Sequence, residues 1–180
     1  MIKIHEFIKK VQNKEIDIVE HTHKIIEKTK KIDKEYNYFT TISEKLALEQ
    51  AKNLKKNPKG KLAGIAITVK DSICVKNVNS TAGSRILNSY IPPFNATVIE
   101  KVIREGGIII GKTTQDEFGL GTFAINTHKI PKHPLDKYRS TGGSSGGCAG
   151  FTKIADFPHL SIAESTGGSI AVPASFCGIS

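Results

Sequence analysis

Apolar side chains recur at helical spacing through residues 1–60. The first such set predicts an amphipathic helix close to the N-terminus: Ile4, Phe7, Ile8 and Val11. A second helix is predicted after Asp17, because a short carboxylate at this place is a good N-cap. Residues 38–42 are a short β-type run, and a third helix is predicted after Ser43, ending before Pro58. We therefore expect a leading helical segment over residues 1–60.

The pattern changes in residues 61–180. Residues 62–69, LAGIAITV, are a continuous apolar run with β-branched members, which is typical of a strand buried on both faces. A helical pattern opens at Asn95 or Thr97 and ends at a pair of glycines, and residues 108–110 then form a second buried strand. The order strand, helix, strand predicts an α/β core.

Composition and charge narrow the class of protein. The chain is 38% hydrophobic, which fits a soluble domain and excludes collagen and a disordered chain. Its formal net charge of +9 is spread along the chain. Lysines interleaved with glutamates, as in residues 24–35, are typical of solvated helical faces and not of a nucleic-acid surface. A basic chain still suits membership of a tRNA-handling assembly.

The cysteines and the N-terminal residues indicate the cellular compartment of the protein. Cys74, Cys148 and Cys177 are odd in number and have no metal-ligand spacing, so we expect free thiols, no metal site and a reducing compartment. The opening MIKIHEFIKK has no continuous apolar stretch and predicts neither a signal peptide nor a membrane anchor. We expect a cytoplasmic protein without membrane association.

Residues 106–113, GGIIIGKT, formally match the phosphate-binding P-loop pattern. A P-loop needs a strand before its first glycine and a loop that curls around the anion. Here a helical pattern precedes Gly106, and three β-branched isoleucines occupy the positions that would curl. We therefore interpret Lys112 as an ordinary lysine at a strand end and not as a phosphate ligand.

The segment from Gly142 to Gly178 contains eight glycines and a single basic residue, Lys153. Glycines before a serine allow its hydroxyl to be held in a cramped geometry at a helix start, and allow consecutive amides to converge as an oxyanion hole. A serine nucleophile also needs a base. The six histidines are predicted to lie at the surface. Lys70 ends an apolar strand, where burial would favour the neutral amine.

Three segments in this order, GIAITVKDSICVK, TGGSSGG and STGGSIAVPASFCG, closely resemble the amidase signature family. The resemblance implies a mixed β-sheet core covered by helices and a catalytic triad of Lys70 as base, Ser145 as bridging serine and Ser169 as nucleophile. It implies a cis peptide bond between Ser144 and Ser145. Its oxyanion hole would use the amides of Thr166, Gly167, Gly168 and Ser169. Its substrate pocket would include Gly121, Thr122 and Ser144.

Within that family the chain is most similar to the A-type subunits of tRNA-dependent amidotransferases, over nearly its whole length. The resemblance implies a glutaminase that supplies ammonia for conversion of Glu-tRNA(Gln) to Gln-tRNA(Gln). Implied partners are glutamine, a small C subunit, a tRNA-binding B subunit and, through the complex, Glu-tRNA(Gln). ATP and magnesium would belong to the partner subunit, with no cofactor in this chain. A general amidase, or a noncatalytic piece that docks partners through its N-terminal helices, remains an alternative.

The chain departs from the family in two ways. Family members carry GSDTGGSIR where residues 163–171 read AESTGGSIA, so both the Asp and the Arg are missing. If these two charges pair in the family, losing both avoids leaving one uncompensated buried charge. We expect the change to affect substrate orientation or loop support instead of the triad. Family enzymes are also more than twice as long, so we expect an N-terminal fragment or one piece of a split protein, with the glutamine carboxylate site beyond Ser180.

Overall fold

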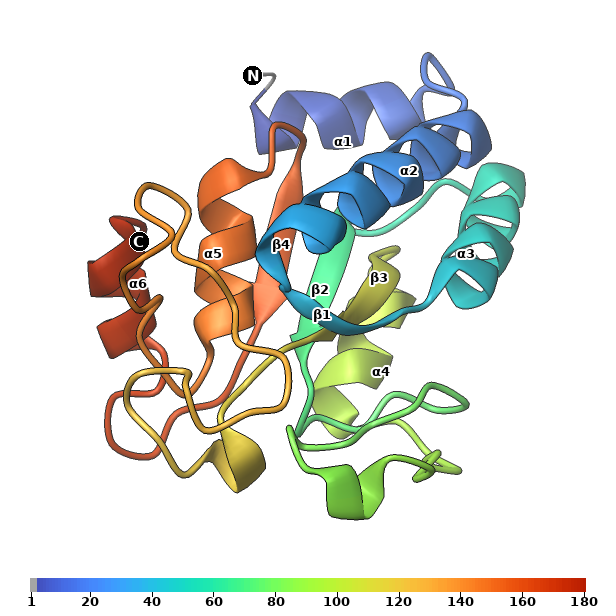
Figure 1. Ribbon diagram of the computed structural model, residues 1–180. Helices are drawn as coiled ribbons and strands as arrows, with labels where there is room; N and C mark the ends of the chain where they lie inside the picture. Colours follow the sequence, from blue (N-terminus) through green and yellow to red (C-terminus); the bar gives the residue numbers. More distant parts are fainter. Residues whose placement is uncertain (1–2) are drawn as a thin grey trace.

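The computed structural model describes residues 3–180 (Figure 1). Its helices and strands follow in chain order: α1 (Ile4–Gln12), α2 (Ile18–Tyr36), β1 (Phe39–Ile42), α3 (Glu44–Lys56), β2 (Ala66–Lys70), η1 (Arg85–Leu87), α4 (Thr97–Arg104), β3 (Ile108–Thr113), η2 (Glu117–Gly119), α5 (Gly146–Ile154), β4 (His159–Ile162) and α6 (Ala171–Cys177). The predicted mixed α/β class is confirmed.

Within the described residues the strands form a four-stranded sheet of order β1-β3-β2-β4. The central strand β2 is parallel to both β3 and β4, whereas β1 runs antiparallel to β3. Parallel neighbours need crossover connections: α4 lies on the connection from β2 to β3, and α5 lies on the connection from β3 to β4, which pairs with the other edge of β2. In Figure 1, α5 and α6 lie to the left of the sheet, α3 lies to its right and α4 lies below β3.

Strands β2 and β3 are buried at every residue, as a strand covered on both faces requires. β2 begins at Ala66, four residues later than the apolar run predicted. The reason lies at Gly64, which has a φ of +81° and would place a Cβ 2.8 Å from Ile18 Cδ1. Close packing of α2 against this turn therefore delays the strand.

The predicted helix starts are close to the observed ones, but their caps differ. The Asp17 carboxylate accepts hydrogen bonds from the amides of Val19 and Glu20, as predicted for an N-cap. Ser43 also precedes a helix, yet its hydroxyl donates to the Ile109 carbonyl at 2.9 Å. Ser43 thus attaches α3 to β3 instead of capping α3.

The leading segment shares one hydrophobic core with the rest of the chain. Phe39 of β1 meets Phe151 of α5 edge to face, with ring centroids 4.9 Å apart. The Tyr38 hydroxyl donates to the Lys132 carbonyl at 2.8 Å. These contacts join segments more than 90 residues apart in the chain and fix β1 as the edge of the sheet beside β3.

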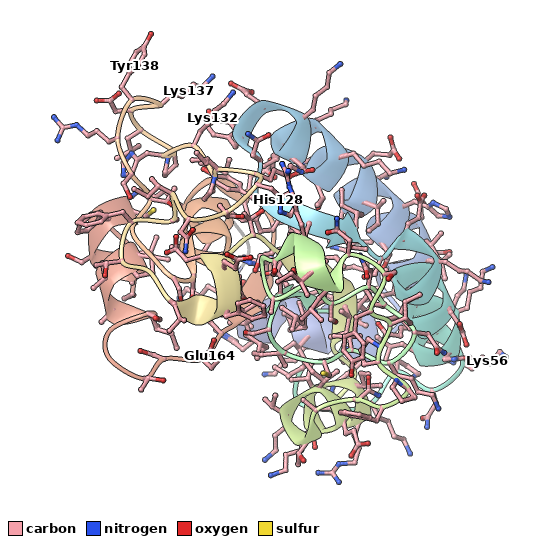
Figure 2. The ribbon with its side chains drawn as sticks, turned by 60° about the horizontal axis from the view of Figure 1, so that its bottom comes forward. Lys56, His128, Lys132, Lys137, Tyr138 and Glu164 are labelled. Atoms are coloured by element: carbon pink, nitrogen blue, oxygen red, sulfur yellow. The ribbon has the colours of Figure 1, made fainter. Side chains whose placement is uncertain are left out.

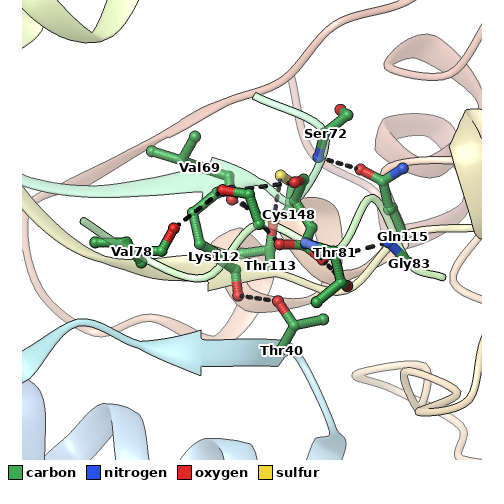
Figure 3. Close-up of polar contacts among 12 residues, drawn as sticks. Thr40, Val69, Ser72, Val78, Thr81, Gly83, Lys112, Thr113, Gln115 and Cys148 are labelled. Carbon is green, nitrogen blue, oxygen red and sulfur yellow. Dashed lines mark hydrogen bonds and ion pairs between the residues drawn. The ribbon is translucent and has the colours of Figure 1, made fainter. Parts of the chain in front are cut away.

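Lys112 is not an ordinary strand-end lysine, and that prediction was wrong. β3 continues past Ile110 to Thr113, so Lys112 lies fully buried inside it (Figure 3). Its Nζ donates to Ser80 Oγ at 2.6 Å and to the Asp71 carbonyl at 3.1 Å, and lies 3.4 Å from Asp71 Oδ1. Burial lowers the pKa of Lys112, and the negative charge of Asp71 opposes that shift. Because residues 108–113 form a strand, they form no phosphate-binding loop.

We expect Lys112→Met to lower the free energy of unfolding by about 3 to 5 kcal/mol, because it leaves the buried Asp71 carboxylate without its cation. The double variant Lys112→Met with Asp71→Asn removes both charges and should recover much of that loss. Urea unfolding measures both. Lys24→Met is the matched control, since the Lys24–Glu20 pair is exposed. A single Lys112→Met variant as stable as the native protein contradicts the prediction.

Candidate active site

Lys70 is the last residue of β2, and its side chain is fully buried. Its Nζ donates to Ser144 Oγ at 2.7 Å and to the Glu164 carbonyl at 3.1 Å. The Glu164 carboxylate also lies 2.6 Å from Nζ. The predicted base therefore meets one hydroxyl from the glycine-rich turn and one carboxylate from the loop after β4.

The structure places Ser144, and not Ser145, beside Lys70. The cis peptide bond joins Gly143 to Ser144, so the predicted position between Ser144 and Ser145 was wrong by one residue. Ser145 is the residue before α5, and its buried hydroxyl has no hydrogen-bond partner within residues 3–180. It lines a groove with Cys148 and Ile170 instead. Two adjacent serines thus face different surroundings.

Asp116 holds the turn that carries Ser144. Its amide donates to the Ser144 carbonyl at 3.1 Å, and its carboxylate accepts from the amides of Ala124 and Asn126 at 3.0 and 2.9 Å. A Cβ on Gly143 would overlap Asp116 Oδ2. Residue 143 must therefore be glycine for this carboxylate to support the turn.

Two residues predicted for a substrate pocket lie beside this turn. The Thr122 carbonyl accepts from the Gly143 amide at 2.7 Å. Gly121 lies against Asp116, where a Cβ would overlap the carboxylate carbon. Both are exposed; Thr122 contacts the Ser144 turn through its carbonyl, and Gly121 leaves room for the Asp116 carboxylate. Their contact with a substrate stays a prediction.

The predicted nucleophile lies on the loop between β4 and α6. The Ser169 carbonyl accepts from the Ser145 amide at 3.3 Å, which brings this loop to the start of α5. In the described part of the chain, the Ser169 hydroxyl has no hydrogen bond to Ser144 or Lys70. The predicted oxyanion-hole residues Thr166 and Gly167 are exposed. Their roles stay predictions.

Ser165 occupies the position of the missing family aspartate. Its Oγ accepts from the Gly168 amide at 3.1 Å, so a neutral hydroxyl holds the turn that precedes Ser169. Gly168 has a φ of +119° there, which suits glycine. The loop is thus supported without the Asp and Arg charges.

Sequence reasoning missed Glu164. Besides contacting Lys70, its Oε1 accepts from Ser72 Oγ at 3.1 Å. Burial opposes ionisation of Glu164, but hydrogen bonds and charge from Lys70 together with Ser72 outweigh it and lower the pKa. The family pattern GSDTGGSIR has serine at this position, and that difference is the signal in the sequence that would have pointed to Glu164.

The histidines do not supply an alternative base. His133 is buried, contrary to the surface prediction, and its ring lies 3.0 Å from the Phe176 carbonyl. Burial lowers the pKa of His159 on β4 to about 4, and its ring lies 3.1 Å from Ser161 Oγ. Within residues 3–180 neither ring has a hydrogen bond to Ser144 or Ser169.

The fold and this Lys–Ser arrangement define a class, and comparison with known proteins identifies it. The Amidase family profile matches residues 20–180. The chain therefore belongs to the amidase signature family. None of the helices within residues 3–180 is sufficiently long and apolar to traverse a membrane.

Among curated relatives, the chain is 41% identical over 175 residues to the A-type subunit of glutamyl-tRNA(Gln) amidotransferase from Sulfurisphaera tokodaii, covering 96% of this chain and 37% of that protein. It is 44% identical to the Methanosarcina mazei protein of the same name, covering 92% of this chain and 34% of that protein. The chain thus spans less than two fifths of the length of these relatives.

Solved structures share the fold. The A-type subunit of the Thermotoga maritima glutamyl-tRNA(Gln) amidotransferase matches with a TM-score of 0.76 and 27% identity, over 98% of this chain and 36% of that one. A chain from a vestigial complex connected with the origins of an s-triazine catabolic enzyme matches with a TM-score of 0.91, also at 27% identity, over 98% and 40%.

We expect Gly143→Ala to destabilise the protein by roughly 1 to 3 kcal/mol, because the new methyl group would overlap the Asp116 carboxylate. Gly167→Ala is the matched control, since a Cβ there meets no atom within 4 Å. Thermal unfolding of both variants measures the difference. Equal stability of the two variants contradicts a supporting role for Asp116.

Proposed function

We propose that the protein is the glutaminase part of a glutamyl-tRNA(Gln) amidotransferase, hydrolysing the side-chain amide of glutamine and supplying ammonia. The Lys70–Ser144 hydrogen bond of 2.7 Å carries this proposal, because it couples a buried amine to a hydroxyl beside the Ser169 loop. The names of relatives about 40% identical support the choice of glutamine among amides.

In the proposed reaction Ser169 is the nucleophile and Ser144 is the proton relay. Neutral Lys70 takes a proton from Ser144 while Ser144 takes one from Ser169, whose oxygen attacks the amide carbonyl. Ser144 then returns a proton to the departing nitrogen, so ammonia leaves and a glutamyl ester remains on Ser169. Water hydrolyses that ester to glutamate and restores the hydroxyl. Ser144 replaces Ser145 in this role because it is the serine that contacts Lys70.

The negative charge that develops on the carbonyl oxygen needs donors. The amides of Thr166, Gly167 and Ser169 are the proposed donors, whereas the Gly168 amide already donates to Ser165 Oγ. One such donor contributes about 2.7 to 4 kcal/mol in comparable sites. This segment contains Gly167 and Gly168, whose lack of side chains leaves the backbone accessible to a substrate.

The whole assembly is part of the proposal. A tRNA-binding B subunit would use ATP and magnesium to activate Glu-tRNA(Gln), and a small C subunit would complete the complex. The ammonia released here would be consumed there, giving Gln-tRNA(Gln). We propose no cofactor for this chain and a cytoplasmic location.

A general amidase of the same family would share Lys70 and Ser144 but act on another amide. The high fold similarity to a chain connected with the origins of an s-triazine catabolic enzyme supports this alternative. Ammonia release that depends on glutamine and is stimulated by Glu-tRNA(Gln) distinguishes the amidotransferase glutaminase from a general amidase. A purely docking role would leave Ser169 unlabelled by a reactive amide analogue.

Glutamine-dependent ammonia release by the full-length protein with its partner subunits tests the relay. We expect Ser144→Ala to lower kcat by roughly 10² to 10⁴-fold, because the proton path from Ser169 to Lys70 is interrupted. Ser145→Ala is the matched control on the adjacent residue and should retain most activity. Loss of activity in Ser145→Ala with retention in Ser144→Ala contradicts the assignment. Undiminished release in Ser169→Ala contradicts the proposed function as a whole.

A further inference from the structure

Three acceptors surround the Lys70 amine. They are Ser144 Oγ at 2.7 Å, the Glu164 carbonyl at 3.1 Å and Glu164 Oε1 at 2.6 Å. A lysine ammonium has three N–H donors and no lone pair, and here it donates two hydrogen bonds, to Ser144 Oγ and the Glu164 carbonyl, and forms an ion pair with the Glu164 carboxylate. A base must instead present a lone pair to the proton that it takes. The arrangement is therefore that of a charged lysine at rest and not of a base ready to react.

Glu164 is held less firmly than the lysine it contacts. Its side chain is 47% exposed, whereas that of Lys70 is fully buried. Figure 2 shows the labelled Glu164 at the rim of the molecule, on the loop that follows β4. Apart from Lys70, the contact that holds its carboxylate is the Ser72 hydroxyl. A side-chain rotation into solvent therefore separates Glu164 from Lys70 without opening a cavity.

Other titratable groups near Lys70 do not substitute for Glu164. Burial raises the pKa of the Cys148 thiol on α5 to about 11, so this group is neutral near pH 7. The Asp71 carboxylate faces Lys112, Thr81 and Gly83. The Asp116 carboxylate accepts from two backbone amides. Within the described residues, Glu164 is the carboxylate paired with Lys70.

We propose that Glu164 is a positioning residue that keeps Lys70 charged in the resting site and must release it before catalysis. This inference rests on the proposed function. When the carboxylate turns into solvent, one proton leaves Nζ for water and a lone pair forms on the amine. The hydrogen bond to Ser144 then reverses, with the Ser144 hydroxyl donating to Nζ. Lys70 becomes able to accept the proton that Ser169 passes on.

The pH dependence of glutamine-dependent ammonia release by the full-length protein with its partner subunits tests this role. In the proposed mechanism, activity rises with pH because the base must be unprotonated, and this part of the pH profile is its rising limb. Glu164→Gln keeps the size of the side chain without its charge, and Glu164→Ser restores the family residue. We expect the rising limb to move to lower pH in both variants, because each removes the negative charge that lies 2.6 Å from the amine. At a fixed pH on that limb, both variants should therefore release ammonia faster than the native protein.

Glu100→Gln is the matched control, since it removes an exposed carboxylate from α4 and should leave the limb in place. The inference is overturned if the rising limb of the pH profile stays in place in both Glu164 variants. This holds even when kcat falls, because a role in loop support alone would change the rate without moving the limb. Thermal unfolding of each variant confirms that it is folded. If ammonia release depends on Ser169 but the limb does not move, only the role of Glu164 is rejected and the proposed function stands. Release that survives Ser169→Ala rejects the proposed function and this inference with it.

Discussion

Two lysines without exposed surface lie at adjacent positions of the central strands, and both need a carboxylate. Lys70 ends β2 opposite Thr113, and Lys112 on β3 lies opposite Val69. Removing an ammonium group from water costs several kcal/mol unless a counter-charge and hydrogen bonds replace the solvent. The segments that follow β2 and β4 supply those partners. The arrangement of loops at this end of the sheet therefore depends on neutralising two buried charges.

The two ion pairs differ in how far they are exposed to solvent. Asp71 and Lys112 are both fully buried, and Asp71 Oδ2 also accepts from the amides of Thr81 and Gly83. Neither partner can move without leaving polar groups unsatisfied, so this pair stabilises the fold. Glu164 instead reaches Lys70 from an exposed loop. The buried Asp71–Lys112 pair is suited to stabilising the fold. The partly exposed Glu164–Lys70 pair is suited to a lysine that changes its protonation state, as proposed.

Hydrophobic periodicity predicted most elements because their burial is determined locally. The buried runs of β2 and β3 and the Asp17 cap follow from a few adjacent residues. The site was predicted only in part. Adjacent serines have almost the same local sequence, and only contacts with Lys70 and Asp116 distinguish Ser144 from Ser145. The Lys70–Glu164 pair joins residues 94 positions apart, which no local pattern reveals.

The position of the formal charges around the nucleophile loop bears on the proposed role of Lys70 as a base. Substituting Ser165 and Ala171 for an Asp and an Arg leaves the formal charge of the nucleophile loop unchanged, whereas Glu164 adds one negative charge. Lys70 balances that charge at rest, so the pair is neutral. When Lys70 loses its proton, the remaining negative charge is on a carboxylate that already faces water, where its solvation is favourable.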